Sequence, residues 1–139
     1  MMIKEDVLEF ATKNPVCSLA TVDGHVPRVR MIMLYQADEN GIIFVTGRQK
    51  ALHAQLQANP SVEMCFYNAE EGRQVRIEGT SEMLDDIELK KKVVEKFTFL
   101  KPWVESQGYE VMVCYRLKKA KATTWTMETN FEPKVHIQL

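Results

Sequence analysis

The chain has 139 residues, a length typical of one domain, and 45% of them are hydrophobic, which is enough for a sizeable core. The net charge is −1, so the composition gives no general reason to expect nucleic acid or an anionic membrane as a partner. The charged start lacks the features of a signal peptide, and no apolar run approaches the roughly 20 residues that cross a bilayer. We therefore expect a cytoplasmic protein.

The first half of the sequence predicts a helix followed by three strands. The helix, Lys4–Lys13, has apolar residues at helical spacing and is stopped by Asn14-Pro15. Turn signals at Asp23-Gly24 and Asn40-Gly41 separate three runs typical of strands. These runs are Val16–Val22, Val26–Tyr35 and Ile42–Thr46. Because the turns are tight, we expect the three strands to form an antiparallel meander.

The second half alternates between helices and strands. A helix is predicted over Gln49–Ala58 and another over Ile87–Phe99, where Asp85-Asp86 can cap the start. The predicted strands are Ser61–Asn68, Gln74–Leu84, Tyr109–Leu117 and Ala122–Met127. The tail, Glu128–Leu139, shows no clear pattern. The whole chain, 1–139, therefore predicts one mainly β domain with flanking helices, a six- to seven-stranded antiparallel barrel that leaves few free edges.

The cysteines and histidines have structural explanations. Cys17, Cys65 and Cys114 are far apart in hydrophobic stretches, which favours buried, reduced thiols. No close ligand pair indicates a zinc site, so we expect no metal. His25 and His53 are expected to be exposed to solvent, and no catalytic triad or pair of carboxylates can be argued.

Polar residues follow the third predicted strand at the point where the second helix begins. Val45, Thr46 and Gly47 lead directly into Arg48-Gln49-Lys50. A helix start has unpaired N–H groups and a partial positive charge, so a hydroxyl and two cations there could cradle a phosphate. The alternative is a solvated polar turn. On the preceding strand, Arg28 and Arg30 are two residues apart and therefore share a face.

The segment RQVRIEG, residues 73–79, has alternating polar and apolar side chains. It predicts a strand with one polar face. Gln74 could hydrogen-bond the edge of a heterocyclic ligand, or the polar face could be an ordinary exposed edge of the sheet.

Five segments, in order, resemble the flavin mononucleotide (FMN)-binding core of the pyridoxamine 5'-phosphate oxidase family. They are PRVRMIM, IIFVTG, a Lys at the head of a helix, QANP and RQVRIEG, and they cover roughly residues 16–84. The resemblance implies a split-barrel fold and FMN as cofactor. It also implies a homodimer with two FMN sites at the interface, each built from both subunits.

The resemblance also implies roles for individual residues. Arg30 and the three residues after it would line the flavin, Val45 and Thr46 would touch its ring and ribityl phosphate, and Lys50 would bind the phosphate. Gln74 would reach the flavin from its own strand, and Trp125 would flank it or lie in the core. The full set of expected cofactor-binding residues is Arg28, Arg30, Met31, Ile32, Met33, Val45, Thr46, Arg48, Lys50, Gln74 and Trp125.

Two departures from the family pattern stand out. Family oxidases place a longer loop and an Arg-Lys pair before the helix, whereas this chain has Gly47-Arg48-Gln49-Lys50, in which Arg48 could replace the arginine. True oxidases end in a motif with Arg and His that holds the substrate phosphate, and residues 123–139 lack it. The chain is more similar to the short general-stress and nitroimidazole-resistance branch, and pyridoxamine phosphate is not its expected substrate.

Three functions follow from these patterns. The first is an FMN-dependent oxidoreductase that passes electrons from a reduced nucleotide to a small planar acceptor, with the redox chemistry supplied by the cofactor. The second is a non-catalytic protein that stores flavin or senses redox state. The third is a site for haem or a deazaflavin, with His136 as a candidate haem ligand.

Overall fold

The computed structural model describes all residues, 1–139, and consists of eight strands, four α-helices and two short 3-10 helices. The strands are β1 (Val16–Asp23), β2 (Val26–Met33), β3 (Gln36–Asp38), β4 (Gly41–Gly47), β5 (Ser61–Asn68), β6 (Arg73–Leu84), β7 (Met112–Thr126) and β8 (Ile137–Gln138). The helices are α1 (Lys4–Lys13), α2 (Ala51–Ala58), α3 (Ile87–Lys96), η1 (Thr98–Leu100), α4 (Lys101–Gln107) and η2 (Tyr109–Val111).

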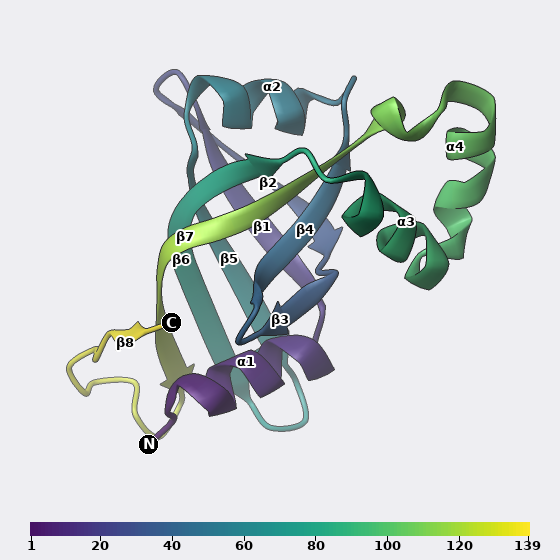
Figure 1. The fold of residues 1–139 in the computed structure, drawn as a ribbon. Coiled ribbons are helices and arrows are strands. Elements are labelled where there is room, and N and C mark those ends of the chain that lie inside the picture. Colours follow the sequence, from purple (N-terminus) through teal and green to yellow (C-terminus); the bar gives the residue numbers. More distant parts are fainter.

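All strands belong to one antiparallel sheet, which confirms the predicted mainly β class. The order is β2-β1-β5-β6-β7-β4-β3, and β8 pairs with β7. Strands β2 and β3 follow each other along the chain but lie at opposite ends of this order, so the sheet curls into a barrel that is split between them (Figure 1). Two backbone bonds hold this corner: Leu34 donates to Pro15 and Tyr35 donates to Ile43.

The expected three-strand meander is wrong. The β1–β2 hairpin forms as predicted, with Val16 opposite Met33. The chain then leaves the β2 edge at Leu34, and the short β3, which was not predicted, forms a hairpin with β4. Strand β4 pairs with β7 on its other side, so β2 and β4 face each other across the split without ladder hydrogen bonds.

The last two predicted strands are one continuous strand, β7. Residues 118–121, which lie between the two predicted strands, contain a β-bulge opposite Gly79, where the register with β6 shifts between Glu78 and Thr80. Lys119 has a left-handed φ of 54° there. A Cβ on Gly79 would lie only 3.0 Å from the Lys118 carbonyl oxygen, so glycine permits this close approach. Both long strands curve strongly, as Figure 1 shows.

The hydrophobic residues form two clusters. The larger one fills the barrel, with Phe44, Phe66 and Tyr115 fully buried, and α1 covers one end of it while α2 lies across the other (Figure 1). The smaller cluster joins α3 to the outer side of β4 and β7 through Val93, Val94, Phe97, Met112 and Cys114.

The region after β6 differs from its prediction. Asp86 caps α3 as expected, because its carboxylate accepts from the N–H groups of Glu88 and Leu89. The helix ends at Lys96 rather than Phe99, and a fourth helix, α4, begins where Pro102 suggested only a break. Proline fits there because the first turn of a helix does not need its missing N–H.

The thiols are reduced, and two of the three are buried. Burial raises the pKa of the Cys17 thiol to about 12 and that of Cys114 to about 11, so both stay neutral. Cys65 is only partly buried. The longest helices have 10 residues, and none is long and apolar enough to cross a bilayer.

Candidate functional site

A cleft of about 740 Å³ lies at the split of the barrel, between β2 and the end of β4. The start of α2 borders one part of it, and the α3–α4 region borders the other. The cleft brings together seven of the predicted site residues: Arg30, Met31, Ile32, Met33, Val45, Thr46 and Lys50. Four consecutive residues of β2 reach it because this strand has a neighbour on only one side, which leaves its outer edge free.

The start of α2 presents backbone donors to the cleft that have no acceptor in the protein. Lys50 donates to the Gly47 carbonyl, but the N–H groups of Gln49, Ala51 and Leu52 make no hydrogen bond. No side chain caps this helix, and its first turn has no acidic residue. Free N–H groups together with the positive end of the helix dipole favour an anion at this position.

Arg30 lies beside this helix start as a half-buried cation without a counter-ion. Its Nη1 donates to the Leu19 carbonyl oxygen at 3.1 Å and to Thr21 Oγ1 at 2.9 Å, and its Nη2 donates to Gln55 Oε1 at 2.5 Å. All three acceptors are neutral. Burial lowers the pKa of Arg30.

Two further groups of the cleft have no partner within the chain. Thr46 is a largely buried residue at the end of β4, but its hydroxyl keeps some access to solvent and makes no hydrogen bond to the protein. The Lys50 ammonium is exposed and forms no salt bridge, although its stem lies against Gly47, where an added Cβ would be 3.4 Å from Lys50 Cγ. Thr46, Lys50 and Arg30 therefore line the same cleft as the residues with unpaired N–H groups.

The other part of the cleft is uncharged and aromatic. It is lined from the α3–α4 region by Phe97, Phe99, Leu100, Trp103 and Gln107. Phe99 stacks on Phe97 with ring centroids 5.4 Å apart, yet it is still 62% exposed, and Trp103 is 59% exposed. The sequence prediction missed these residues. The signal was available, because Phe97, Phe99 and Trp103 surround Pro102 in a segment otherwise rich in Lys and Glu.

Arg28 and Arg48 do not line the cleft. Arg28 shares a face with Arg30 as predicted, but it lies near the hairpin turn and its Nε contacts Asp23 at 3.2 Å. Arg48 contacts the segment before β7 instead. Its Nε donates to the Glu110 carbonyl oxygen at 2.8 Å, and its backbone N–H donates to the Val111 carbonyl oxygen. Arg48 thus fixes the start of β7 beside the end of β4.

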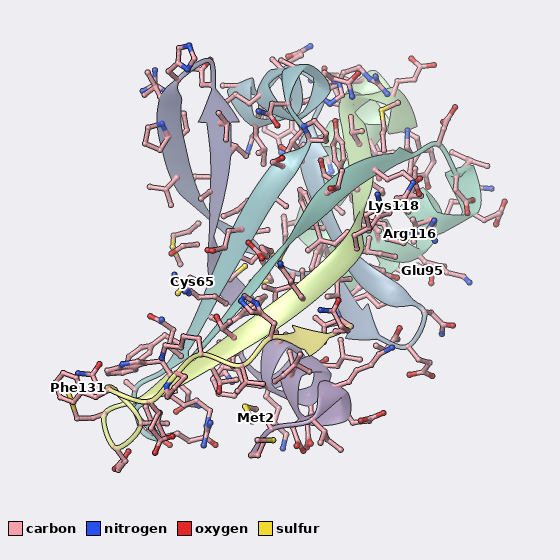
Figure 2. The ribbon with its side chains drawn as sticks, turned by 90° about the vertical axis from the view of Figure 1, so that its left-hand side faces the viewer. Met2, Cys65, Glu95, Arg116, Lys118 and Phe131 are labelled. Atoms are coloured by element: carbon pink, nitrogen blue, oxygen red, sulfur yellow. The ribbon has the colours of Figure 1, made fainter.

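Gln74 and Trp125 also lie outside this cleft. They are directly opposite each other on β6 and β7, so the structure brings them together but away from Arg30 and Lys50. The Trp125 indole donates to Asn130 Oδ1 at 2.8 Å, which ties the strand to the C-terminal loop. Figure 2 shows Phe131 of this loop extending from the far end of the molecule, and its side chain is 98% exposed.

The histidines are separate from the cleft. His53, expected to be exposed, is half-buried, with its Nδ1 2.6 Å from the hydroxyl of the buried Tyr115, which also accepts from Gln57. Burial, followed by the charge of Arg48, lowers the pKa of His53. His136 is exposed in the tail. No group of three or more His, Cys, Asp or Glu side chains could hold a metal ion.

The fold is a split antiparallel barrel with a cleft at its open seam. Residues 3–114 match the pyridoxamine 5'-phosphate oxidase family, and the chain belongs to that family. A pyridoxine/pyridoxamine 5'-phosphate oxidase from Microcystis aeruginosa is 34% identical over 92 residues. That match covers 66% of this chain but only 41% of the cyanobacterial protein, so the chain spans less than half of that relative's length.

Solved structures share this fold over nearly the whole chain. A NimC/NimA family protein from Clostridium acetobutylicum has a TM-score of 0.81 at 24% identity, covering 98% of this chain and 93% of that one. A FAD-binding protein from Mesorhizobium loti has a TM-score of 0.66 at 16% identity, covering 90% of this chain and 96% of that one. HutZ, a heme storage protein from Vibrio cholerae, has a TM-score of 0.64 at 17% identity, covering 85% of this chain and 90% of that one. These similarities establish the split-barrel fold.

Proposed function

We propose that the chain is an FMN-binding flavoprotein whose phosphate site lies at the start of α2. The observation that carries the proposal is that Arg30 and Lys50, neither of them ion-paired, line one cleft with helix-start residues whose N–H groups have no acceptor. A phosphomonoester offers the charge and the several acceptor oxygens that these donors lack. Thr46 would donate its hydroxyl to the same phosphate or to the adjoining ribityl chain.

The rest of the cleft suits the flat ring of a flavin. Met31, Ile32 and Met33 on the free edge of β2 supply apolar contacts and main-chain polar groups, and Val45 lies on the facing strand. A mainly apolar groove with a few placed polar groups is the usual form of a cofactor site. The family membership and the FAD-binding neighbour in M. loti support a flavin as the ligand.

We infer an oxidoreductase role from the uncharged aromatic part of the cleft. When bound, FMN supplies the redox chemistry, accepting a hydride from a reduced nicotinamide and passing two electrons to an acceptor. Phe99 and Trp103 form a wall against which a small planar acceptor could stack. No charged side chain from α3 or α4 lines the cleft, so nothing there would hold the phosphate of pyridoxamine phosphate.

The proposal includes a homodimer with FMN at the interface. Gln74 and Trp125 lie together on the β6–β7 surface, outside their own cleft, and would serve the cleft of the other subunit. Val29, Met31 and Met33 on β2 are exposed and apolar, as expected of a surface that a second copy covers. We expect a species of about twice the 16.1 kDa chain mass in sedimentation, and a monomer that retains FMN would contradict the shared site.

Haem and simple flavin storage are the alternatives. No histidine lines the cleft, so a haem iron there would lack an imidazole ligand from the residues around it. Flavin storage or redox sensing would use the same cofactor site without turnover, and the difference lies in the reaction of the bound cofactor.

The experiment that tests the proposal is the absorption spectrum and mass of the cofactor released from purified protein. We expect flavin bands and the mass of FMN. Bleaching by NADH or NADPH followed by reoxidation with an added acceptor would support an enzyme, whereas a flavin that does not react would support storage or sensing. Colourless protein that also refuses micromolar FMN would overturn the flavin assignment, and a haem Soret band would replace it.

A further inference from the structure

Gln55 lies behind the proposed phosphate site, on the side of α2 that faces the barrel. Its Oε1 atom accepts two hydrogen bonds, from Thr21 Oγ1 at 2.6 Å and from Arg30 Nη2 at 2.5 Å. Thr21 in turn accepts from Arg30 Nη1 at 2.9 Å, which closes a triangle of three side chains. Resting on the proposed function, we propose that Gln55 is a positioning residue that holds Arg30 as a free cation for the phosphate.

The donors that Arg30 has left support this role. A guanidinium has five N–H groups. The carbonyl of Leu19 and the hydroxyl of Thr21 take the two on Nη1, and Gln55 takes one on Nη2. The Nε–H and the second Nη2–H remain without a partner. Two neighbouring N–H groups on one guanidinium suit the oxygens of a phosphate, which arginine frequently binds in a bidentate manner.

The neutral charge of Gln55 matters as much as its shape. A carboxylate at the same place would form an ion pair with Arg30 and satisfy the charge that now attracts an anion. Glutamine supplies an oxygen acceptor that fixes the guanidinium but leaves its charge uncompensated. Thr21 and the Leu19 carbonyl are likewise neutral, so the entire set of acceptors keeps Arg30 cationic and available.

Gln55 also links Arg30 to the helix that provides the other donors. It lies about one turn after Ala51 on α2, the helix whose first residues carry the unpaired N–H groups. A shift of the helix relative to β1 and β2 would break the bonds from both Thr21 and Arg30. The triangle therefore fixes the distance between the arginine and the helix start, the two halves of the phosphate site.

The test compares FMN with riboflavin, which lacks the phosphate, in the full-length protein. The variants are Gln55→Glu, which adds the missing counter-charge, and Gln55→Met, which removes the acceptor. Gln57→Glu is the matched control, because it puts the same charge on the same helix where Gln57 contacts Tyr115 rather than Arg30. Dissociation constants come from flavin fluorescence, and melting temperatures of the cofactor-free proteins report the fold.

We expect Gln55→Glu to weaken FMN binding roughly ten- to a hundredfold, the effect of one charged hydrogen bond or more. The dissociation constant of riboflavin should change less than about twofold. Gln55→Met should weaken FMN by a smaller factor, and Gln57→Glu should leave both ligands unchanged. Equal losses for FMN and riboflavin, or a marked fall in melting temperature, would show that Gln55 is only structural and would overturn the proposal. Unchanged FMN binding in both Gln55 variants would also overturn it.

Inorganic phosphate separates this proposal from the flavin assignment. Rising phosphate concentration should raise the melting temperature of the cofactor-free protein but not that of Gln55→Glu. If the protein refuses FMN and still shows this difference, the flavin assignment fails while the role of Gln55 stands. If neither phosphate nor FMN affects the original protein, both proposals fail together.

Discussion

The cations of the cleft and those on the paired strands β6 and β7 are the same residue types in opposite electrostatic settings. On these strands, Glu82 contacts Arg116 at 2.8 Å and Lys118 at 2.9 Å, and Lys121 contacts Glu78 at 3.1 Å. Figure 2 shows Arg116 and Lys118 close together on one side of the molecule. At the cleft, Arg30 and Lys50 have no carboxylate partner.

This difference identifies the binding site better than the number of basic residues does. A paired cation on a strand surface already has its counter-charge, and its attraction for a ligand is weakened by the carboxylate and by salt. An unpaired cation next to free helix N–H groups has no counter-charge in the protein, so it can form an ion pair with an anionic ligand. Variants of Lys50, Thr46 and Glu82 test whether missing counter-charges and helix donors together define the site.

The largest expected effect comes from Lys50→Ala. If the ammonium makes a charged hydrogen bond to the phosphate, its loss should weaken FMN by roughly 1.5–3 kcal/mol, about ten- to a hundredfold or more in dissociation constant. Lys121→Ala removes a lysine that is already paired with Glu78 and should leave FMN affinity unchanged. The dissociation constants of FMN for both variants are measured by flavin titration at a fixed salt concentration. Equal affinities for the two variants would count against the phosphate site at α2.

Thr46→Val should have a smaller effect. Valine keeps the shape of the threonine side chain but removes the hydroxyl at the cleft end of β4. A neutral hydrogen bond contributes about 0.5–1.5 kcal/mol, so FMN should bind roughly two- to tenfold more weakly. Thr123→Val on β7, away from the cleft, is the control. A change of the same size in both variants would indicate a general effect on the sheet rather than a lost contact with FMN.

The sequence was informative where local patterns decide the structure. The β1–β2 hairpin follows from Asp23-Gly24, and Gly24 has the left-handed φ of 63° that such a turn needs. The cap of α3 by Asp86 follows from the same kind of local chemistry, whereas α2, predicted from Gln49, begins at Ala51. The candidate phosphate donors Thr46 and Lys50 could therefore be predicted, because they lie within five residues of one another, at a strand-to-helix junction.

Long-range pairing could not be predicted in the same way. Nothing within residues 26–47 shows that β4 pairs with β7, some seventy residues later in the chain, rather than with β2. The same limit applies to Gln55, whose bonds to Thr21 and Arg30 depend on how α2 lies across the barrel. Gln74 and Trp125 show it too, since their pairing on β6 and β7 became visible only in the folded sheet.

The smallest expected effect comes from Glu82→Gln, which frees Arg116 and Lys118 of their shared carboxylate. Hydrogen bonds from Lys118 and then Arg116 lower the pKa of Glu82 from its ordinary value of 4.5. Since the folded pKa is the lower one, the stabilisation is present at neutral pH and is lost as the pH falls below about 4.5 through the depressed value. The salt bridges of Glu82 lie at the surface, so they contribute little to stability. The melting temperature of Glu82→Gln should therefore fall by a few degrees at most at pH 7, and by less in high salt.

The affinity of Glu82→Gln for FMN tests whether unpaired cations alone make a phosphate site. This variant leaves Arg116 and Lys118 unpaired at a place without a helix start. We expect no second flavin or phosphate site on β7 and no change at the first. Melting curves from pH 7 to pH 3, with and without phosphate, measure both effects. If phosphate stabilised the variant more than the original protein, unpaired cations alone would suffice to bind it. The free N–H groups of Gln49, Ala51 and Leu52 would then be unnecessary for the site at α2.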